Sequence, residues 1–478
     1  MPKVATWVSP DVVEILFLIV QVVVAASVTA HVLLRKRNVR SALGWIGVAW
    51  LSPLIGGLLY YLFGVNRVSR RALHLGKLGR AWSQVARHPL PTEEAPNIET
   101  LASIGLRVTG HPLTSGNNVT LLHGGDVAYP AMLAAIRDAR QSIALASYIF
   151  RNDSIGRSFV GALGEAQSRG VAVCVLLDGV GCGYILPAVL RKLTAGRVPV
   201  ARFLHTWAPW RMPFLNMRNH KKLLIVDGTT GFTGGLNIGA ESAARLTSRN
   251  RIDDVHARIE GPVVRHLMET FANDWSFTTG EVLDQTIWWP ELTPIGPIIA
   301  RGIASGPDAD RGKLETILGA ALTQARARVR IVSPYFLPDQ RLQFAITETL
   351  LRGVAVDIVI PEVSDYRFMS WAMRAHLRFL TEFPVNVYVS PPPFDHAKLM
   401  TLDREWCLIG SSNWDTRSLR LNFEFDLECY DWTLTAELDK LIDRKIAQSR
   451  RLSREELMAA PTWQQLRDAA TRLLLPYL

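Results

Sequence analysis

The C-terminal part of this chain repeats itself, and the duplication limits the possible folds more than any other feature. The paired stretches are SIALASYIF (142–150) with RVRIVSPYF (328–336), RGVAVCVLLD (169–178) with RGVAVDIVIP (352–361), and HKKLLIVDGTTGFTGGLN (220–237) with HAKLMTLDREWCLIGSSN (396–413). They lie 186, 183 and 176 residues apart and keep their order, so the loops differ in length while the elements persist. We therefore infer a duplicated domain of about 160–180 residues rather than a short solenoid repeat.

Short β-branched runs alternate with helical patterns in each half. The helical pattern YPAMLAAIRDAR (129–140) precedes the strand at 142–150, and SFVGALGEAQSRG (158–170) precedes VAVCVLLD (171–178). This alternation predicts an α/β fold of two mixed or largely parallel sheets flanked by helices, related by a pseudo-twofold axis. The strand runs are almost continuously apolar, as expected for strands buried on both faces.

The N-terminus carries two apolar segments. Residues 15–34 contain no Lys, Arg, Asp or Glu, and a helix of this length spans about 30 Å, enough for a bilayer core. Residues 41–66 are also uncharged, and only RKRNVR (35–40) separates the two. We predict a tight hairpin of membrane helices at about 15–34 and 42–64, and so a multi-pass membrane protein. The alternatives are a cleavable signal peptide and a buried core helix.

These features divide the chain into four parts. They are the membrane hairpin at 1–66, a basic connector at 67–116, the first repeat at 117–292, and the second repeat with C-terminal helices at 293–478. The formal charge of +10 favours anionic partners, either nucleic acid or an anionic membrane surface. The four cysteines, which form no CxxC pair, are interpreted as buried thiols.

The third repeated stretch has the spacing H-x-K-x4-D in both halves. His220 and Lys222 precede the strand-like run LLIV, and His396 and Lys398 precede LMTL. Residues i and i+2 of a strand share a face, so each histidine projects beside its lysine. This pairing indicates an anionic substrate, because lysine gives charge-assisted hydrogen bonds to phosphate and histidine can act as nucleophile or general acid/base.

The rest of each motif extends away from the histidine. Asp227 and Asp403 end the motifs five positions after the lysines, about 17 Å away along a strand, so we expect them to brace the structure rather than touch substrate. Small-residue turns follow at 234–237 and 410–413, and each ends in an asparagine, Asn237 or Asn413. Such turns let backbone N–H groups approach an anion, although they also serve as ordinary hairpin turns.

The paired motifs resemble the phospholipase D superfamily, and other stretches narrow the resemblance to bacterial cardiolipin synthases. Those stretches are RKRNVRSALGWIGVAWLSPLIGGLLYYLFGVNR (35–67), GGLNIGAES (234–242), DDVHARIEGP (253–262) and SSNWDTRSLRLNFEFDLECYD (411–431). The chain departs from the wider superfamily at Gly235, where a serine is often found; Ser411 keeps that serine in the second half. The aromatic residue expected soon after Glu241 is also absent.

The resemblance implies transfer of a phosphatidyl group through a covalent phosphohistidine. Two phosphatidylglycerols would give cardiolipin and glycerol at the inner membrane of a bacterium. One histidine attacks the phosphodiester while the other protonates the departing alcohol and then deprotonates the incoming hydroxyl. His220 is favoured as the nucleophile by analogy with the superfamily. The groups expected to hold the phosphate oxygens are Lys222, Lys398, Asn237, Asn413 and Ser411. No metal or other cofactor is expected.

Each catalytic histidine also needs an orienting carboxylate on its other ring nitrogen. Glu424 lies 28 residues after His396, and alignment of the halves puts Asp254 in the matching strand. Both runs alternate like half-buried strands. The alternative is that these acids are solvated or pair with the nearby Arg251 and Arg258.

Other segments allow weaker predictions. Asp178 and Asp365 end matched strands, where a loop role is favoured over contact with a glycerol hydroxyl. The aromatic stretch at 205–214 is expected to be a surface loop, either an interfacial wedge or a small aromatic cluster. The basic helix expected at 437–451 is interpreted as a solvated face rather than a lipid contact.

Three alternative functions stay open. A phospholipase D could hydrolyse phospholipid or exchange its head group. A nucleic-acid phosphodiesterase fits the positive charge, but the membrane hairpin argues against nucleic acid as a partner. A non-catalytic membrane scaffold is disfavoured by two intact motifs. The leading partners are phosphatidylglycerol, other anionic phospholipids and the bacterial membrane.

Overall fold

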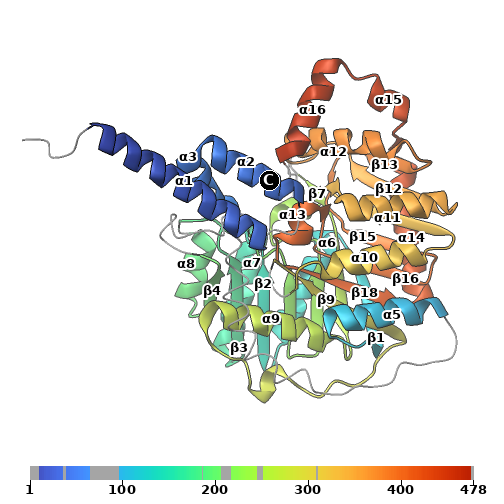
Figure 1. Ribbon diagram of the computed structural model, residues 1–478. Coiled ribbons are helices and arrows are strands. Elements are labelled where there is room, and N and C mark those ends of the chain that lie inside the picture. The colour runs from blue at the N-terminus through green and yellow to red at the C-terminus, as the bar shows by residue number, and fades with distance from the viewer. Residues whose placement is uncertain are drawn as a thin grey trace, which may run out of the picture. The chain divides into compact units, whose positions relative to one another are not determined.

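The computed structural model describes residues 10–35, 39–64, 96–185, 187–205, 217–244, 251–307 and 310–474. These residues form two compact units, the N-terminal helices and the residues from 96 onward (Figure 1). The aromatic stretch expected as a loop at 205–214 lies outside the described residues from position 206 on.

The N-terminal unit contains one helix long and apolar enough to cross a membrane. Its elements are α1 (Pro10–Arg35), α2 (Val39–Leu51), α3 (Pro53–Leu59) and η1 (Tyr60–Gly64). The candidate span, judged by length and composition, is Val12–Arg35 of α1. Among the described helices no second one passes this test, so the predicted pair of spanning helices is reduced to one candidate.

The helix predicted at 42–64 is interrupted at Ser52. Proline lacks a backbone N–H and disfavours a helical conformation in the residue before it. Ser52 accordingly has φ −147° and ψ 79°, and α3 starts at Pro53. The prediction of a single helix was wrong because hydropathy does not register this backbone effect. The broken segment packs on α1, where the phenol of Tyr60 lies 2.7 Å from His31 Nδ1.

The second unit is built on one sheet of 15 strands (Figure 1). In spatial order the first half contributes β4 (Val200–Phe203), β3 (Ala172–Asp178), β2 (Ser142–Ser147), β5 (Leu223–Val226), β6 (Thr230–Gly234), β8 (Val255–Glu260) and β1 (Thr114–His123). The second half continues with β9 (Ile298–Ser305), β18 (Glu424–Tyr430), β16 (Trp406–Gly410), β15 (Leu399–Leu402), β10 (Arg328–Val332), β12 (Ala355–Pro361), β13 (Asn386–Ser390) and β19 (Arg450–Arg451). The two halves therefore place matching strands in mirrored order.

The expectation of two separate sheets was wrong. β1 pairs antiparallel with β9, opposite Ala300 at Thr114 and opposite Ile298 at Asn117, and this joins the halves into one sheet. The pairing satisfies backbone groups that each half would otherwise leave open at a sheet edge. The sheet is mixed. Only β2–β3–β4 and β10–β12–β13 are parallel, and the remaining neighbours are antiparallel.

Helices cover the sheet in equivalent places of the two halves. The helices of the first half are α6 (Gly125–Asp138), α7 (Ser154–Ser168), α8 (Ala188–Ala195), η3 (Ala240–Ser242), α9 (Val264–Thr279) and η4 (Thr286–Trp288). Those of the second are α10 (Lys313–Gln324), α11 (Gln340–Leu351), α12 (Arg367–Leu380), α13 (Thr416–Arg420), α14 (Trp432–Gln448), α15 (Arg454–Met458) and α16 (Thr462–Leu474). α9 packs on β2, β4 and β5, as α14 packs on β10, β13 and β15 (Figure 1).

Each half has its own hydrophobic core. The range expected as a connector contains α5 (Pro96–Thr109), whose buried Leu101 belongs to the core of the second half. β1 begins at Thr114, three positions before the predicted start of the first repeat at 117. The described end of the connector is therefore part of the folded unit.

Two short pairings cross between the halves and matter for the site. β7 (Ile252–Asp253) pairs parallel with β14 (Phe394–Asp395), and Asn219 forms an isolated bridge with Phe423. The second two-stranded sheet, β11 (Phe336–Leu337) with β17 (Trp414–Asp415), lies within the second half. In each crossing pair, the segment just before a motif histidine in one half lies alongside the segment just before Asp254 or Glu424 in the other half.

Candidate active site

The two motif histidines line one cavity of about 1560 Å³. His220 precedes β5 in the first half and His396 precedes β15 in the second. Both halves contribute to the wall, so the cavity lies where they meet. The duplication predicted two copies of the motif, and the fold brings the two copies together.

Each histidine is oriented by a carboxylate from the opposite half. Nδ1 of His220 lies 2.8 Å from Glu424 Oε2, and Nδ1 of His396 lies 2.7 Å from Asp254 Oδ2. The backbone follows the same exchange, because the N–H of His220 donates to Phe423 at 2.8 Å and that of His396 donates to Asp253 at 2.7 Å. With Nδ1 engaged, Nε2 is the ring nitrogen left for a substrate.

The electrostatics keep these pairs as neutral imidazole and ionised carboxylate. Burial lowers the pKa of His220 and of His396 to about 4, although the carboxylates act in the opposite direction. Burial would raise the pKa of Asp254 and Glu424, but the neighbouring histidines and lysines hold both below the usual range. An ionised carboxylate accepts a hydrogen bond from Nδ1–H. The neutral ring then has its lone pair on Nε2.

The two lysines share this buried centre. Lys222 Nζ donates to the carbonyl of His220 at 2.6 Å, and Lys398 Nζ donates to the carbonyl of His396. Burial lowers the pKa of Lys222 to about 7 and that of Lys398 to about 8, and the charge of Lys398 lowers the pKa of Lys222 further. A bound phosphate would favour the charged form of both lysines.

Asp227 and Asp403 lie away from the cavity and hold backbone. The Asp227 carboxylate accepts from the N–H groups of residues 140, 141 and 142 at 2.7–3.2 Å. The Asp403 carboxylate accepts from those of residues 326, 327 and 328 at 2.7–2.8 Å. Both aspartates have positive φ, near 50°. They fix the start of β2 and β10 against the turns that leave β5 and β15.

The two asparagines line the cavity, whereas the serine supports a carboxylate. Asn237 Oδ1 accepts from the N–H of Ile149 at 3.3 Å. Asn413 Nδ2 donates to Ser418 at 3.2 Å, and its Oδ1 is buried without a hydrogen-bond partner in the described part of the protein. Ser411 donates to Glu424 Oε2 at 2.6 Å and is fully buried. Ser411 therefore braces the His220 partner instead of facing the cavity.

Gly235, at the position equivalent to Ser411, makes room for the other carboxylate. A Cβ at Gly235 would lie 2.1 Å from Asp254 Oδ1. The two halves thus orient their carboxylates differently, with a serine hydroxyl beside Glu424 and a glycine without a side chain beside Asp254. The alternative that Asp254 pairs with arginine is wrong, since Asp254 binds His396 and Arg258 binds Glu260 at 2.7 Å.

A buried ion pair behind each histidine was missed from the sequence. Lys445 Nζ lies 2.7 Å from Asp253 and 2.8 Å from Asp395, the residues on either side of the β7–β14 pairing. In the first half Lys221 lies 2.8 Å from Asp274 of α9. The prediction of a solvated face for 437–451 fails at Lys445, which is buried.

The weaker acidic candidates separate clearly. Asp178 accepts from the backbone N–H groups of residues 180, 181 and 219 at 2.6–3.0 Å, which is a loop role. Asp365 lines the cavity and accepts a hydrogen bond from the phenol of Tyr335. Glu241, also at the cavity wall, binds Arg151 at 3.2 Å. In the part of the chain that the structure describes, no group of three or more His, Cys, Asp or Glu side chains is placed to hold a metal ion.

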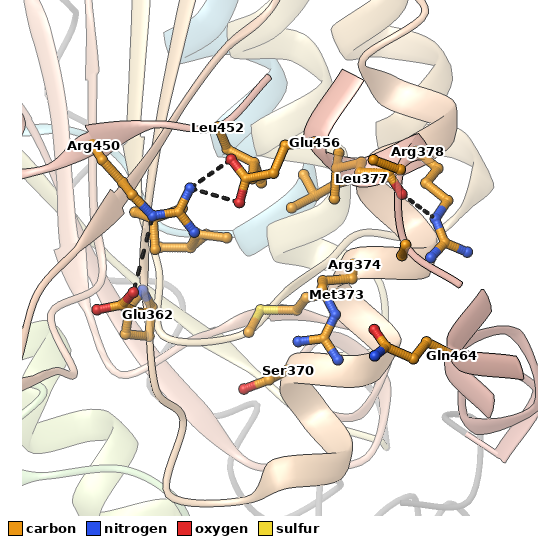
Figure 2. A pocket seen from close by; sticks show the side chains of 16 residues that line it. Glu362, Ser370, Met373, Arg374, Leu377, Arg378, Arg450, Leu452, Glu456 and Gln464 are labelled. Carbon is orange, nitrogen blue, oxygen red and sulfur yellow. Dashed lines mark hydrogen bonds and ion pairs between the residues drawn. The ribbon is translucent and has the colours of Figure 1, made fainter. Parts of the chain in front are cut away.

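A second hollow of about 460 Å³ lies by α12, α15 and α16 (Figure 2). Its arginines are already engaged, since Arg450 binds Glu456 at 2.7 Å and Arg374 binds Asp468 at 3.1 Å. Its lining contains no histidine. The cavity between the halves is therefore the candidate active site.

Comparison with known proteins identifies the family of the chain. A family model described as cardiolipin synthase, PLD-like domain, matches residues 132–275 and 318–446, and a phospholipase D-nuclease N-terminal model matches residues 23–64. Cardiolipin synthase A of Pseudomonas fluorescens (strain SBW25) is 30% identical over 458 residues, which are 94% of this chain and 95% of that protein. Cardiolipin synthase of Geobacillus kaustophilus (strain HTA426) is 31% identical over 468 residues, covering 93% and 90%.

A solved structure shows the same fold. The crystal structure of phosphatidylserine synthase from Haemophilus influenzae Rd KW20 superposes with a TM-score of 0.62 at 15% identity, covering 79% of this chain and 100% of that one. With the family models and the relatives, the conclusion is that the chain belongs to the cardiolipin synthase family of phospholipase D-like proteins.

Proposed function

We propose that the protein joins two phosphatidylglycerol molecules into cardiolipin with release of glycerol. The observation that carries the proposal is the pair of neutral histidines that line one cavity, each with an ionised carboxylate on Nδ1, and the two buried lysines whose charges act on His220. That arrangement suits two successive displacements at an anionic phosphodiester. The cardiolipin synthases that share 30–31% identity over nearly the whole chain support this substrate class.

The reaction divides between the two histidines. Nε2 of His220 attacks phosphorus, the bond to the glycerol oxygen breaks, and His396 gives that oxygen its proton. His396 then takes the proton of the incoming hydroxyl, whose oxygen attacks phosphorus as the bond to His220 breaks. The negative charge of the bound phosphate raises the pKa of the imidazoles, so His396 takes up a proton from solvent on Nε2 before it protonates the glycerol oxygen. Lys222, Lys398 and the two cavity asparagines hold the non-bridging oxygens.

The N-terminal unit is the part of the chain that we propose as the membrane anchor. We propose that residues 1–66 anchor it in the bacterial inner membrane, with α1 spanning and the uncharged 41–66 segment returning through the bilayer as a broken second pass. The proposed parts are 1–66, 67–116, 117–292 and 293–478, except that α5 and the start of β1, at the end of the connector, belong to the folded unit. The mirrored strand order supports a pseudo-twofold relation between the repeats.

Incubation of the purified full chain with phosphatidylglycerol in detergent micelles tests the function. Cardiolipin and glycerol are the expected products by mass. Phosphatidic acid and glycerol without cardiolipin would show a phospholipase D. His220→Ala and His396→Ala should each abolish cardiolipin formation, since general-base help alone contributes roughly 10²–10⁴-fold. Turnover by both variants would rule out the paired-histidine mechanism.

The division of roles has its own test. Acid quench and peptide mass analysis at alkaline pH, where phosphohistidine survives, should find the adduct on the peptide that contains His220. His396→Ala should still form that adduct with a substrate whose leaving group needs no protonation. An adduct on the His396 peptide would reverse the assignment and leave the overall chemistry standing.

A further inference from the structure

Two arginines, one from each half, come together in the active-site cavity. Arg218 lies two residues before His220, and Arg417 lies on α13, which follows the turn at 410–413. Both line the cavity together with His220. Four arginines line the cavity, the others being Arg151 and Arg251, and none of them belongs to the histidine–lysine centre.

Backbone hydrogen bonds hold the segments of Arg218 and Arg417 next to each other. The carbonyl of Arg417 accepts from the N–H of Asn422 at 3.0 Å, and the carbonyl of Arg218 accepts from the N–H of Phe423 at 2.8 Å. Consecutive residues of one segment thus hold the two arginines side by side across the boundary between the halves. The same segment ends in Glu424, the partner of His220.

The charges of the two arginines act on each other and on Tyr148. Burial lowers the pKa of Arg417, and the charge of Arg218 lowers it further. Burial and Asp178 raise the pKa of the Tyr148 phenol, and both arginines oppose that rise. The Tyr148 ring stands edge-on to His220, with ring centroids 4.8 Å apart. Both arginines therefore act on Tyr148, whose ring contacts His220.

The two carboxylates that act on these arginines, Asp178 on Arg218 and Asp415 on Arg417, also hold backbone. Asp178 accepts three backbone N–H groups, and Asp415 accepts those of residues 417 and 418 at 2.8 and 2.9 Å as the cap of α13. Arg218 Nη1 donates to the carbonyl of Met217 at 2.9 Å. Two like charges held together beside a substrate cavity favour an anion between them, and paired guanidinium forks match phosphate geometry.

We propose that Arg218 and Arg417 bind the phosphodiester of the second lipid, the one whose hydroxyl accepts the phosphatidyl group. The inference rests on the proposed function. Cardiolipin carries two phosphodiesters on one glycerol, so the site that makes it holds one phosphate at the histidines and the other a glycerol length away. A hydrolase has no use for the second position. The arginine pair is thus a specificity determinant for an anionic lipid acceptor over water or a neutral alcohol.

A competition between acceptors isolates this step. The full chain in mixed micelles receives phosphatidylglycerol as donor together with a neutral monoacylglycerol as competing acceptor. Both products arise from the same covalent intermediate, so their ratio cancels any effect on the first displacement. Arg218→Gln and Arg417→Gln should shift the ratio of cardiolipin to phosphatidyl-monoacylglycerol roughly ten- to hundredfold toward the neutral product, the usual effect of losing a hydrogen bond to a charged group.

The control is Arg151→Gln, which alters another cavity arginine that is already bound by Glu241 and leaves the ratio unchanged. Arg417→Lys should restore part of the cardiolipin, because the charge returns without the fork. Thermal unfolding confirms that each variant is folded. An unchanged product ratio in both glutamine variants overturns the arginine site, whatever happens to the total rate. Absence of cardiolipin from the wild-type protein would instead overturn the proposed function.

Discussion

Replacing Gly235 with alanine should push the carboxylate of Asp254 away from His396. The added Cβ would lie 2.1 Å from Asp254 Oδ1 and 2.6 Å from Oδ2, whereas ordinary contact begins at 3.4 Å. The carboxylate is held by His396 at 2.7 Å and by the N–H of Val255 at 2.8 Å. It therefore has to retreat by more than an ångström, which takes it out of hydrogen-bond range of the imidazole.

The size of the effect follows from the burial of the pair. Asp254 is 1% exposed, and an uncompensated buried charge costs about 3–5 kcal/mol. Gly235 does not need a positive φ, so backbone strain adds nothing. His396 would lose the group that fixes its tautomer, and cardiolipin formation should fall by roughly 10²–10⁴-fold.

The assay compares initial rates on phosphatidylglycerol micelles with thermal unfolding of the same samples. Gly161→Ala on α7 is the matched control, because a Cβ there meets no atom within 4 Å. It should keep full activity and gain up to about 1 kcal/mol of stability from the better helix propensity of alanine. Wild-type turnover and unfolding temperature in Gly235→Ala would refute the reasoning, since Asp254 would then have another place to go.

Three further predictions concern charge. Lys445→Met should lower the unfolding free energy by roughly 3–5 kcal/mol in urea titrations, since it leaves two carboxylates facing each other; an equal loss in Lys440→Met, at an exposed position of α14, would contradict this. Burial raises the pKa of Asp426 to about 7, so the folded protein keeps a proton that the unfolded chain releases, and stability should fall as pH rises from about 4 to 7. Asp426→Asn should flatten this fall, and parallel unfolding curves at pH 5 and 8 for both proteins would exclude it. Because the pKa values of Lys222 and Lys398 are lowered to about 7 and 8, tungstate affinity measured by calorimetry should weaken as pH rises through that range, and a flat profile would show that neither lysine binds the anion.

The sequence could predict the members of the site but not their pairing. The duplicated motif marks His220 and His396, and alignment of the halves marks Asp254 and Glu424. Each hydrogen bond, however, joins residues 142 or 204 positions apart and crosses between the halves. A strand pattern tells which face a residue takes, whereas the partner across a domain boundary depends on how β7 and β14 pair, and those strands are two residues long.

Two predictions about larger features were wrong because they depend on backbone hydrogen bonds, which the side-chain pattern does not reveal. Hydropathy predicted one helix across 42–64, but Pro53 removes a hydrogen bond and turns the chain at Ser52. The same kind of reasoning predicted two sheets, because each half alone forms a complete strand–helix pattern. Their union depends on the open edges of β1 and β9, and the sequence does not indicate which edge stays free until another half covers it.

The two halves keep one architecture while their supporting charges differ, and this bears on which histidine holds the phosphatidyl group. Glu424 receives hydrogen bonds from three side chains, which are His220 at 2.8 Å, Ser411 at 2.6 Å and Asn422 at 3.1 Å. Asp254 receives one from a side chain, that of His396, and one from its neighbouring backbone N–H. A nucleophile has to stay fixed through attack and release, whereas an acid–base group has to change protonation twice in each cycle. The more firmly held carboxylate therefore suits the nucleophile, which favours His220 for the covalent role and His396 for proton transfer.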